Sequence, residues 1–141
     1  MRVRSRCPVV LGLCAVLVAA GCNGSGEAPK YDVAGKVILD NGALSLGTVT
    51  YFPDAEKGNT EKTPASSQIK PDGTYTLQTP AGFYKVAVTS EGMPTQMPAA
   101  GQAMPKALPI NAKYKNAESS GLRVEVVPSP APGTYDLKVT K

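Results

Sequence analysis

The stretch VAGKVILDNGALSLGTVTYFPD, residues 33–54, contains two segments in which apolar and polar side chains alternate. The apolar members of each segment share one face: Val33, Val37 and Leu39 in the first, Val49 and Tyr51 in the second. A period of two residues is typical of a β-strand with one buried face. The Asp-Asn-Gly between them, residues 40–42, carries an Asn-Gly pair that accepts positive φ, so it is expected to end the first strand.

The same alternation continues toward the C-terminus. Four further segments carry it, TYTLQT (74–79), GFYKVAVT (82–89), GLRVEVV (121–127) and TYDLKVT (134–140), and their inward residues are Tyr75, Leu77, Tyr84, Val86, Val88, Leu122, Val124, Val126, Tyr135, Leu137 and Val139. SSQIK (66–70) is a weaker seventh strand, and LPINAKY (108–114) is either an eighth strand or an irregular edge. The turn KPDG (70–73) has Pro at its second position and Gly at its fourth, which predicts a tight hairpin between the strands on either side.

Strands with one apolar face must cover that face, and two sheets that cover each other form an antiparallel β-sandwich. Twelve of the 13 prolines follow residue 21, and no window has a helical apolar stripe. The sequence therefore predicts an all-β domain over residues 31–141 without long helices.

Several motifs of this domain resemble the carboxypeptidase regulatory-like domain. They are Gly35-Lys36-Val37, residues 47–53, the Asp-Gly-x-Tyr of residues 72–75 and the Pro-Ala-Gly-x-Tyr of residues 80–84. The resemblance covers residues 31–89 by motif and the remainder by strand pattern. It implies a seven-stranded, Ig-like sandwich of the transthyretin (prealbumin) type. In the peptidases that give the domain its name, a separate zinc-binding domain carries the catalysis, and this sequence has no such domain.

The N-terminus has the pattern of an export signal. Arg2, Arg4 and Arg6 precede an apolar run of 15 residues, 7–21. A spanning helix needs roughly 20 apolar residues, so a secretory signal peptide fits this run better than a transmembrane anchor.

The residue that follows this run is Cys22, in the context LVAAGCNGSG (17–26). This junction resembles the lipobox of bacterial lipoproteins, although Ala19 stands where that family usually has Leu. The resemblance implies removal of residues 1–21 and attachment of a diacylglycerol and an N-acyl chain to Cys22. Residues 22–30 would then form a flexible tether, rich in Gly and polar residues, with a reach of roughly 15 Å. Asn23 after the cysteine resembles export to the outer membrane, so we expect anchoring to the cell membrane or the outer membrane, with the domain in the periplasm or at the surface.

Removal of the signal changes the charge and the cysteine count. Three of the 15 Lys and Arg residues leave with it, which leaves 12 against 11 Asp and Glu residues. The mature chain is thus nearly neutral, and a nucleic-acid partner loses its electrostatic basis. Cys7 and Cys14 also leave, so no disulfide is expected within the domain.

The residue inventory argues against catalysis. The chain has no His, and its mature part has no free thiol, which excludes His-dependent nucleophiles and His-ligated metals. Asp54, Glu56 and Glu61 fall in one loop and are expected to be solvated surface charges. We expect a protein that is not an enzyme and has no metal and no cofactor besides the lipid.

Residues 91–109 form the least ordinary segment, because Met93, Met97 and Met104 are each followed by proline. Thioethers are ligands for copper(I), so this loop is a candidate copper site. It is also a candidate contact surface for a partner protein, since methionine side chains adapt to varied surfaces.

Two functions remain open. The first is an anchored interaction or structural module that contacts another envelope protein. The second is a carbohydrate-binding module that stacks sugars on tyrosines. The six tyrosines are Tyr31, Tyr51, Tyr75, Tyr84, Tyr114 and Tyr135. Four of them alternate with the core face, and only Tyr31 and Tyr114 are expected to be free, which favours the interaction module.

Overall fold

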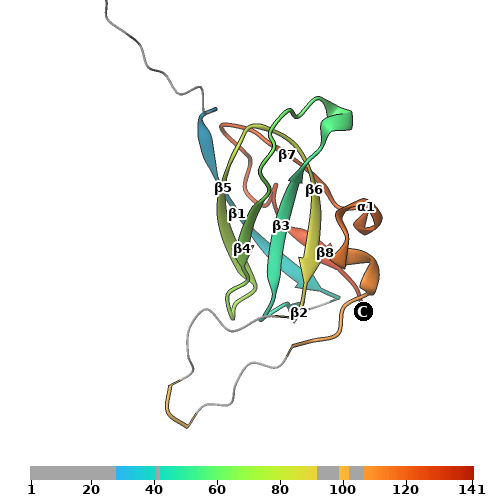
Figure 1. Ribbon diagram of the computed structural model, residues 1–141. Coiled ribbons are helices and arrows are strands. Elements are labelled where there is room, and N and C mark those ends of the chain that lie inside the picture. Colours follow the sequence, from blue (N-terminus) through green and yellow to red (C-terminus); the bar gives the residue numbers. More distant parts are fainter. Residues whose placement is uncertain (1–27, 41, 92–98, 102–106) are drawn as a thin grey trace, which may run out of the picture.

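The computed structural model describes residues 28–40, 42–91, 99–101 and 107–141 and contains two packed sheets (Figure 1). In chain order the strands are β1 (Lys30–Leu39), β2 (Gly42–Ala43), β3 (Thr48–Pro53), β4 (Ala65–Gln68), β5 (Thr74–Pro80), β6 (Gly82–Thr89), β7 (Arg123–Val126) and β8 (Leu137–Val139). Three short helical segments join them: the 3-10 turns η1 (Ala55–Lys57) and η2 (Ala112–Lys115), and α1 (Ala117–Ser120). The all-β sandwich expected from the alternation is confirmed.

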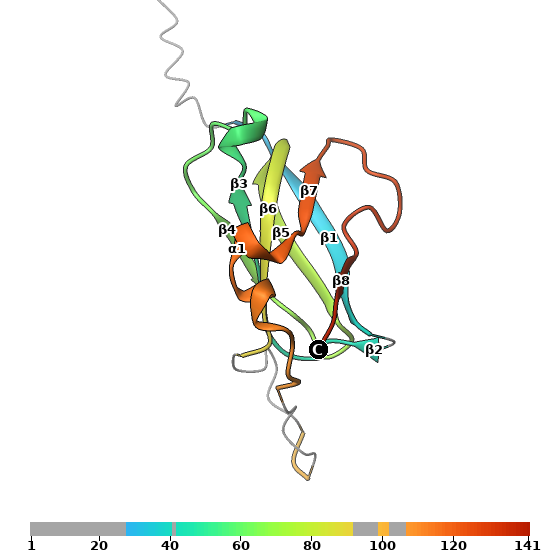
Figure 2. The same cartoon turned by 90° about the vertical axis from the view of Figure 1, so that its right-hand side faces the viewer.

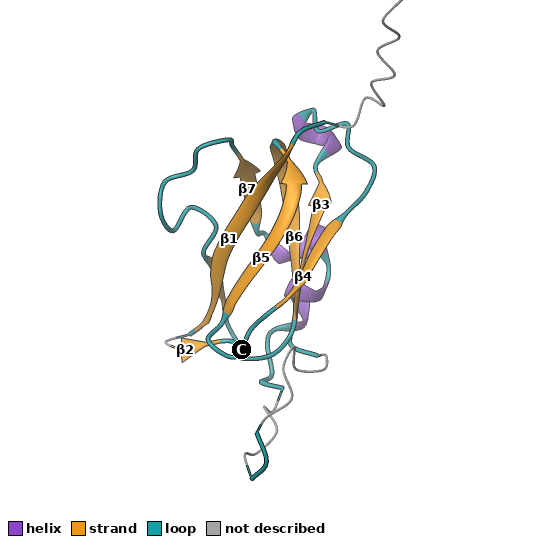
Figure 3. Ribbon diagram, turned by 90° about the vertical axis from the view of Figure 1, so that its left-hand side faces the viewer, coloured by secondary structure: helices purple, strands orange, loops and turns teal. Residues whose placement is uncertain are grey.

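One sheet has the order β2-β1-β5, with β8 also paired to β1, and the other has the order β4-β3-β6-β7. Every pair is antiparallel except β1–β8, in which Val37 lies opposite Leu137 in parallel register. The predicted antiparallel sandwich thus has one exception, at which the last strand runs along β1 in the same direction. Figure 3 shows the two layers of strands face to face.

The core lies between the sheets and consists of the residues that the alternation placed inward. Its buried members include Val33, Val37, Val49, Tyr51, Tyr75, Tyr84, Val86, Val88, Val126, Leu137 and Val139. At Gly35, β1 approaches the segment that precedes β8 very closely. A Cβ there would collide with the carbonyl oxygen of Tyr135 and lie 2.9 Å from the hydroxyl of Tyr75.

The turn at residues 70–73 forms, but the hairpin predicted around it does not. Gly73 N donates to Lys70 O at 2.8 Å, and Gly73 has a φ of +82°, which favours glycine. However, β4 pairs with β3 and β5 pairs with β1, so the turn carries the chain from one sheet to the other. The turn chemistry specifies the reversal of the chain and does not specify the sheet that each strand joins.

Two smaller expectations also need correction. The first strand ends at the predicted turn, but positive φ is found at Asp40 (53°) and not at Gly42, while residue 41 lies outside the described residues. β1 then forms a short hairpin with β2, an eighth strand that the sequence pattern did not indicate. Of the two alternatives for LPINAKY, the strand does not form: the end of the segment forms η2, where the Asn111 side chain accepts a hydrogen bond from Lys113 N.

The strands run between two ends of the sandwich. Lys30 at the start of β1 lies opposite Pro80, and Pro53 at the end of β3 lies opposite Tyr84 near the start of β6. The start of β1 and the loop that contains η1 therefore lie at the same end of the molecule (Figure 1). β6 ends at Thr89, at the opposite end.

Candidate functional site

Two of the sequence-predicted sites cannot be located. Cys22 lies outside the described residues, as do Met93, Met97 and Met104. Lipidation and the methionine-rich contact or copper(I) loop remain predictions. Within the described ranges, no helix is long and apolar enough to cross a membrane.

The tyrosines do not form a surface platform. Tyr51, Tyr75, Tyr84 and Tyr135 are buried, as the alternation predicted. The expectation that Tyr114 is free is wrong, because η2 turns its ring inward and leaves only 5% of it exposed. Tyr31 is partly buried against the core, so a planar array of exposed tyrosines is absent.

The buried tyrosine hydroxyls instead connect strands inside the core. Tyr75 Oη donates to the carbonyl oxygen of Tyr135 at 2.6 Å and lies 2.8 Å from Tyr51 Oη. Because the Tyr75 proton is directed at that carbonyl, Tyr51 is the donor in the second bond. Burial raises the pKa of Tyr51 to about 12 and also raises that of Tyr75. Both hydroxyls therefore stay neutral and hydrogen-bonded at physiological pH.

The exposed aromatic rings lie on the outer face of the β4-β3-β6-β7 sheet. Phe52 on β3 is 39% exposed and Phe83 on β6 is 38% exposed. Phe52 lies opposite Lys85 in the β3–β6 register, which places both rings and Lys85 on one face near the end where β1 begins. The alternation around Tyr51 and Tyr84 implies this outward direction for their neighbours Phe52 and Phe83. The two exposed rings could therefore have been predicted from the sequence.

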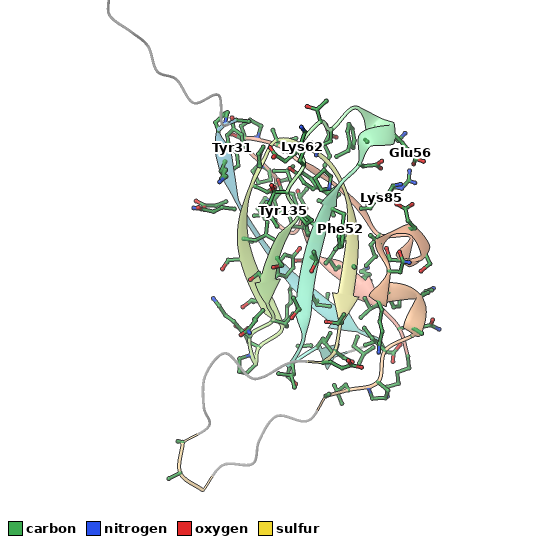
Figure 4. The ribbon with its side chains drawn as sticks, viewed as in Figure 1. Tyr31, Phe52, Glu56, Lys62, Lys85 and Tyr135 are labelled. Atoms are coloured by element: carbon green, nitrogen blue, oxygen red, sulfur yellow. The ribbon has the colours of Figure 1, made fainter. Side chains whose placement is uncertain are left out.

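Lys85 is the centre of a charged cluster between these rings. Its Nζ lies 3.0 and 2.8 Å from the two carboxylate oxygens of Glu118 and 3.0 Å from Glu56 Oε2. The hydrogen bonds that Lys85 donates to Glu118 and, with a smaller effect, to Glu56 raise the pKa of its ammonium, so it stays charged. Arg123 Nη2 lies 3.8 Å from Glu56 Oε2 and extends the cluster onto β7. Glu56 and Lys85 point toward each other in Figure 4.

Glu118 contacts Lys85 because hydrogen bonds hold α1 in position beside the sheet. Asn116 caps the helix by accepting from Glu118 N at 2.9 Å, and Ser120 Oγ donates to the carbonyl oxygen of Val86 at 2.6 Å. The helix therefore lies beside β6, where that strand continues past its pairing with β7 (Figure 2). Lys85 points to the outer face of the sheet, and Glu118 and Glu56 contact its ammonium, so that only 7% of the residue is exposed.

The expectation that the carboxylates of the loop around η1 are all solvated is wrong for Asp54. Its side chain is 1% exposed, whereas the sequence spacing indicated a solvated charge. Among the described residues neither carboxylate oxygen has a hydrogen-bond partner, and Lys85 Nζ lies 3.8 Å from Oδ1. Glu56 is exposed, as expected. A single loop thus holds one exposed carboxylate that is paired and one buried carboxylate that is not hydrogen-bonded.

The chemistry available at this face is recognition by charge and aromatic contact. Lys85 is protonated and its hydrogen bonds go to carboxylates, so it is not a free nucleophile. Among the described residues, no group of three carboxylate, His or Cys side chains is arranged to hold a metal ion.

Comparison with known proteins adds little. No protein-family profile matches the sequence, and no curated protein matches it. Among solved structures, the chain is similar to a DUF3823 family protein from Parabacteroides merdae, with 15% sequence identity and a TM-score of 0.49. The similarity covers 81% of this chain and 46% of the other, so the chain spans about half the length of that protein.

Proposed function

We propose that this protein is a lipid-anchored, non-catalytic binding module of the bacterial cell envelope, which docks an envelope protein on the outer face of the β4-β3-β6-β7 sheet. The observation that carries the proposal is the pair of exposed rings, Phe52 and Phe83, on adjacent strands beside the Lys85 charged cluster. Aromatic residues and Arg are enriched at protein interfaces, where a charged surround adds specificity.

The lipobox-like junction at Cys22 supports the anchor. Lys30 begins β1 at the same end as Phe83, and only a short tether separates it from Cys22. With a tether reach of roughly 15 Å, the docking face stays close to the lipid surface. The partner is therefore expected to be a membrane-associated protein of the same envelope compartment.

The anchor is tested by labelling with radioactive palmitate. Wild-type protein should incorporate label and sediment with membranes, and Cys22→Ser should lose the label and move to the soluble fraction. An unlabelled, soluble wild type would overturn the anchor.

The docking face is tested by replacing Phe52 or Phe83 with a photoreactive phenylalanine analogue, which keeps an aromatic ring in place. The matched control carries the analogue at Thr76, an exposed position on β5 in the other sheet. One envelope protein should crosslink from positions 52 and 83 and not from 76. Equal crosslinking from all three positions would contradict a specific face.

Carbohydrate binding remains the second candidate, now centred on Phe52 in place of the tyrosines. An open groove of about 520 Å³ beside Phe52 is lined by the polar side chains of Lys62, Lys115, Asn116 and Glu118, which are suited to sugar hydroxyls. Retention of the protein on insoluble polysaccharide, with loss in Phe52→Ala, would favour this function. Copper(I) binding by the methionine loop is a less favoured alternative, and substitution of Met93, Met97 and Met104 by Leu would test it.

A further inference from the structure

The buried carboxylate of Asp54 is held in place by its own backbone. Asp54 N and the Asn59 side-chain amide both donate to the carbonyl oxygen of Phe83, at 2.9 and 2.8 Å. The carbonyl oxygen of Asp54 accepts from Lys57 N and Asn59 N at 3.0 and 3.1 Å. These bonds extend the β3–β6 pairing by one residue, so Asp54 lies opposite Phe83 and, two residues after Phe52, on the outer face of the sheet.

The carboxylate itself receives no hydrogen bond. The Lys85 ammonium has three donors, and its close contacts, two to Glu118 and one to Glu56, account for all three. Its 3.8 Å distance to Asp54 Oδ1 is an ion pair without a hydrogen bond. A carboxylate removed from water without donors is costly to the fold, so Asp54 needs a donor that the described residues do not supply.

Asp54 lines an open groove that Lys85 does not line. The groove has a volume of about 390 Å³ and is formed by Asp54, Lys57, Phe83, Arg123, Val124 and Glu125. Asp54 and the exposed ring of Phe83 both line it, and the two carboxylate oxygens of Asp54 are covered in this conformation. A ligand must displace neighbouring side chains to reach the carboxylate, and Lys57 and Arg123, which line the same groove, are exposed.

The charges around the groove and the Lys85 cluster leave a negative excess. Four carboxylates, those of Asp54, Glu56, Glu118 and Glu125, face three cations, those of Lys57, Lys85 and Arg123. The group that completes the site must therefore be a cation, must donate two hydrogen bonds to one carboxylate and must have a flat face for a phenyl ring. Guanidinium meets all three requirements, because its planar fork matches a carboxylate and it stacks on aromatic rings.

We propose that the groove between η1 and β7 binds a guanidinium group, supplied by an arginine side chain of the docked protein, with Asp54 as its acceptor and Phe83 as its stacking surface. This inference rests on the proposed function, since it names the contact that a partner makes at the edge of the docking face. Arg123 is the competing cation of this chain, and its long 3.8 Å contact with Glu56 leaves it weakly held.

The test is titration of the full-length, isotopically labelled chain in detergent micelles with N-acetyl-arginine-N-methylamide, monitored by NMR at the amides of Phe83, Val124 and Glu125. The matched probe is the citrulline analogue, which has nearly the same shape and no charge. The arginine probe should shift these amides, and the citrulline probe should bind at least tenfold more weakly.

Three variants complete the design. Asp54→Asn should lower the affinity for the arginine probe at least tenfold. Glu61→Gln replaces a carboxylate of the same loop that does not line the groove, and it should change this affinity less than twofold. Arg123→Gln should leave the affinity unchanged or increase it, because it removes the competing cation. Equal binding of both probes, or unchanged binding by Asp54→Asn, would overturn the proposal.

Binding of a different ligand in the groove would also overturn the proposal. If maltose or Ca²⁺ shifts the same amides in an Asp54-dependent manner and the arginine probe does not, the site takes a sugar or a metal ion instead. The result is separable from the docking proposal: crosslinks from positions 52 and 83 without arginine binding leave the docking face intact, and arginine binding without crosslinks refutes the docking face alone.

Discussion

The sandwich buries polar side chains on both sides of the β3–β6 strand pair, and the two groups differ in how they are satisfied. On the inner side, Tyr51 and Tyr75 form a hydrogen-bonded chain that ends on the Tyr135 carbonyl. On the outer side, Asp54 is just as inaccessible, and no residue in the described part of the chain donates a hydrogen bond to its carboxylate. A satisfied network offsets the cost of burial and specifies the packing, whereas an unsatisfied carboxylate does neither. The inner tyrosine cluster therefore stabilises the fold, whereas the Asp54 carboxylate is better explained as a binding site for a ligand.

The largest expected effect comes from Gly35→Ala, which attacks the inner cluster directly. The added methyl group would collide with the Tyr135 carbonyl and crowd the Tyr75 hydroxyl, so the free energy of unfolding should fall by about 3 kcal/mol. Urea unfolding followed by far-UV circular dichroism measures it. Gly58→Ala is the control, because its φ of +82° costs about 1 kcal/mol but no atom lies within 4 Å of the new methyl group. Equal losses in both variants would mean that the inner cluster is not tightly packed.

Alkaline pH should weaken the same cluster. An unfolded tyrosine ionises near pH 10, but burial holds the pKa of folded Tyr51 at about 12 and raises that of Tyr75 as well. Between pH 10 and 12 the unfolded state binds fewer protons than the folded state, so stability falls as pH rises. The expected slope is about 1.4 kcal/mol per pH unit for each of the two tyrosines. Below pH 10 neither contributes a slope.

Urea titrations at pH 9, 10 and 11 check this expectation. Tyr75→Phe serves as the control and should show about half the wild-type slope above pH 10. A flat profile would show that water reaches the hydroxyls.

At neutral pH, Tyr75→Phe should lower the free energy of unfolding by about 2 kcal/mol, because the Tyr135 carbonyl and the Tyr51 hydroxyl each lose a buried partner. Tyr114→Phe is the matched substitution. Its hydroxyl is 3.4 Å from Thr140 Oγ1, a long contact, so the loss should stay below about 1 kcal/mol. The reverse order of the two variants would contradict the role given to the inner network.

The inner side was predictable from the sequence and the outer side was not. Alternation places Tyr51, Tyr75 and Tyr84 inward because a strand has only two faces. The same alternation places Lys85 and Asp54 outward, which is correct, but outward is not the same as exposed. Their burial depends on Glu118, 33 residues after Lys85, and on the folding of η1 over the sheet.

The sheet to which each strand belongs was also beyond the sequence pattern. The turn at residues 70–73 reverses the chain equally well within a hairpin or between two sheets. Pairing between strands that are distant in the sequence decides between these outcomes, and the residues of the turn do not indicate it. The burial of Tyr114 has the same origin, since η2 positions its ring against strands that are distant in the chain.

The smallest expected effect tests the central claim that Asp54 does not serve the fold. Asp54→Asn removes a buried charge and loses no hydrogen bond, and Lys85 keeps Glu118 and Glu56 as partners. Its unfolding free energy at neutral pH, measured beside Tyr75→Phe under the same conditions, should be no lower than wild type and up to about 1 kcal/mol higher. A loss of about 2 kcal/mol, equal to that of Tyr75→Phe, would show that Asp54 is a structural residue and would contradict the account.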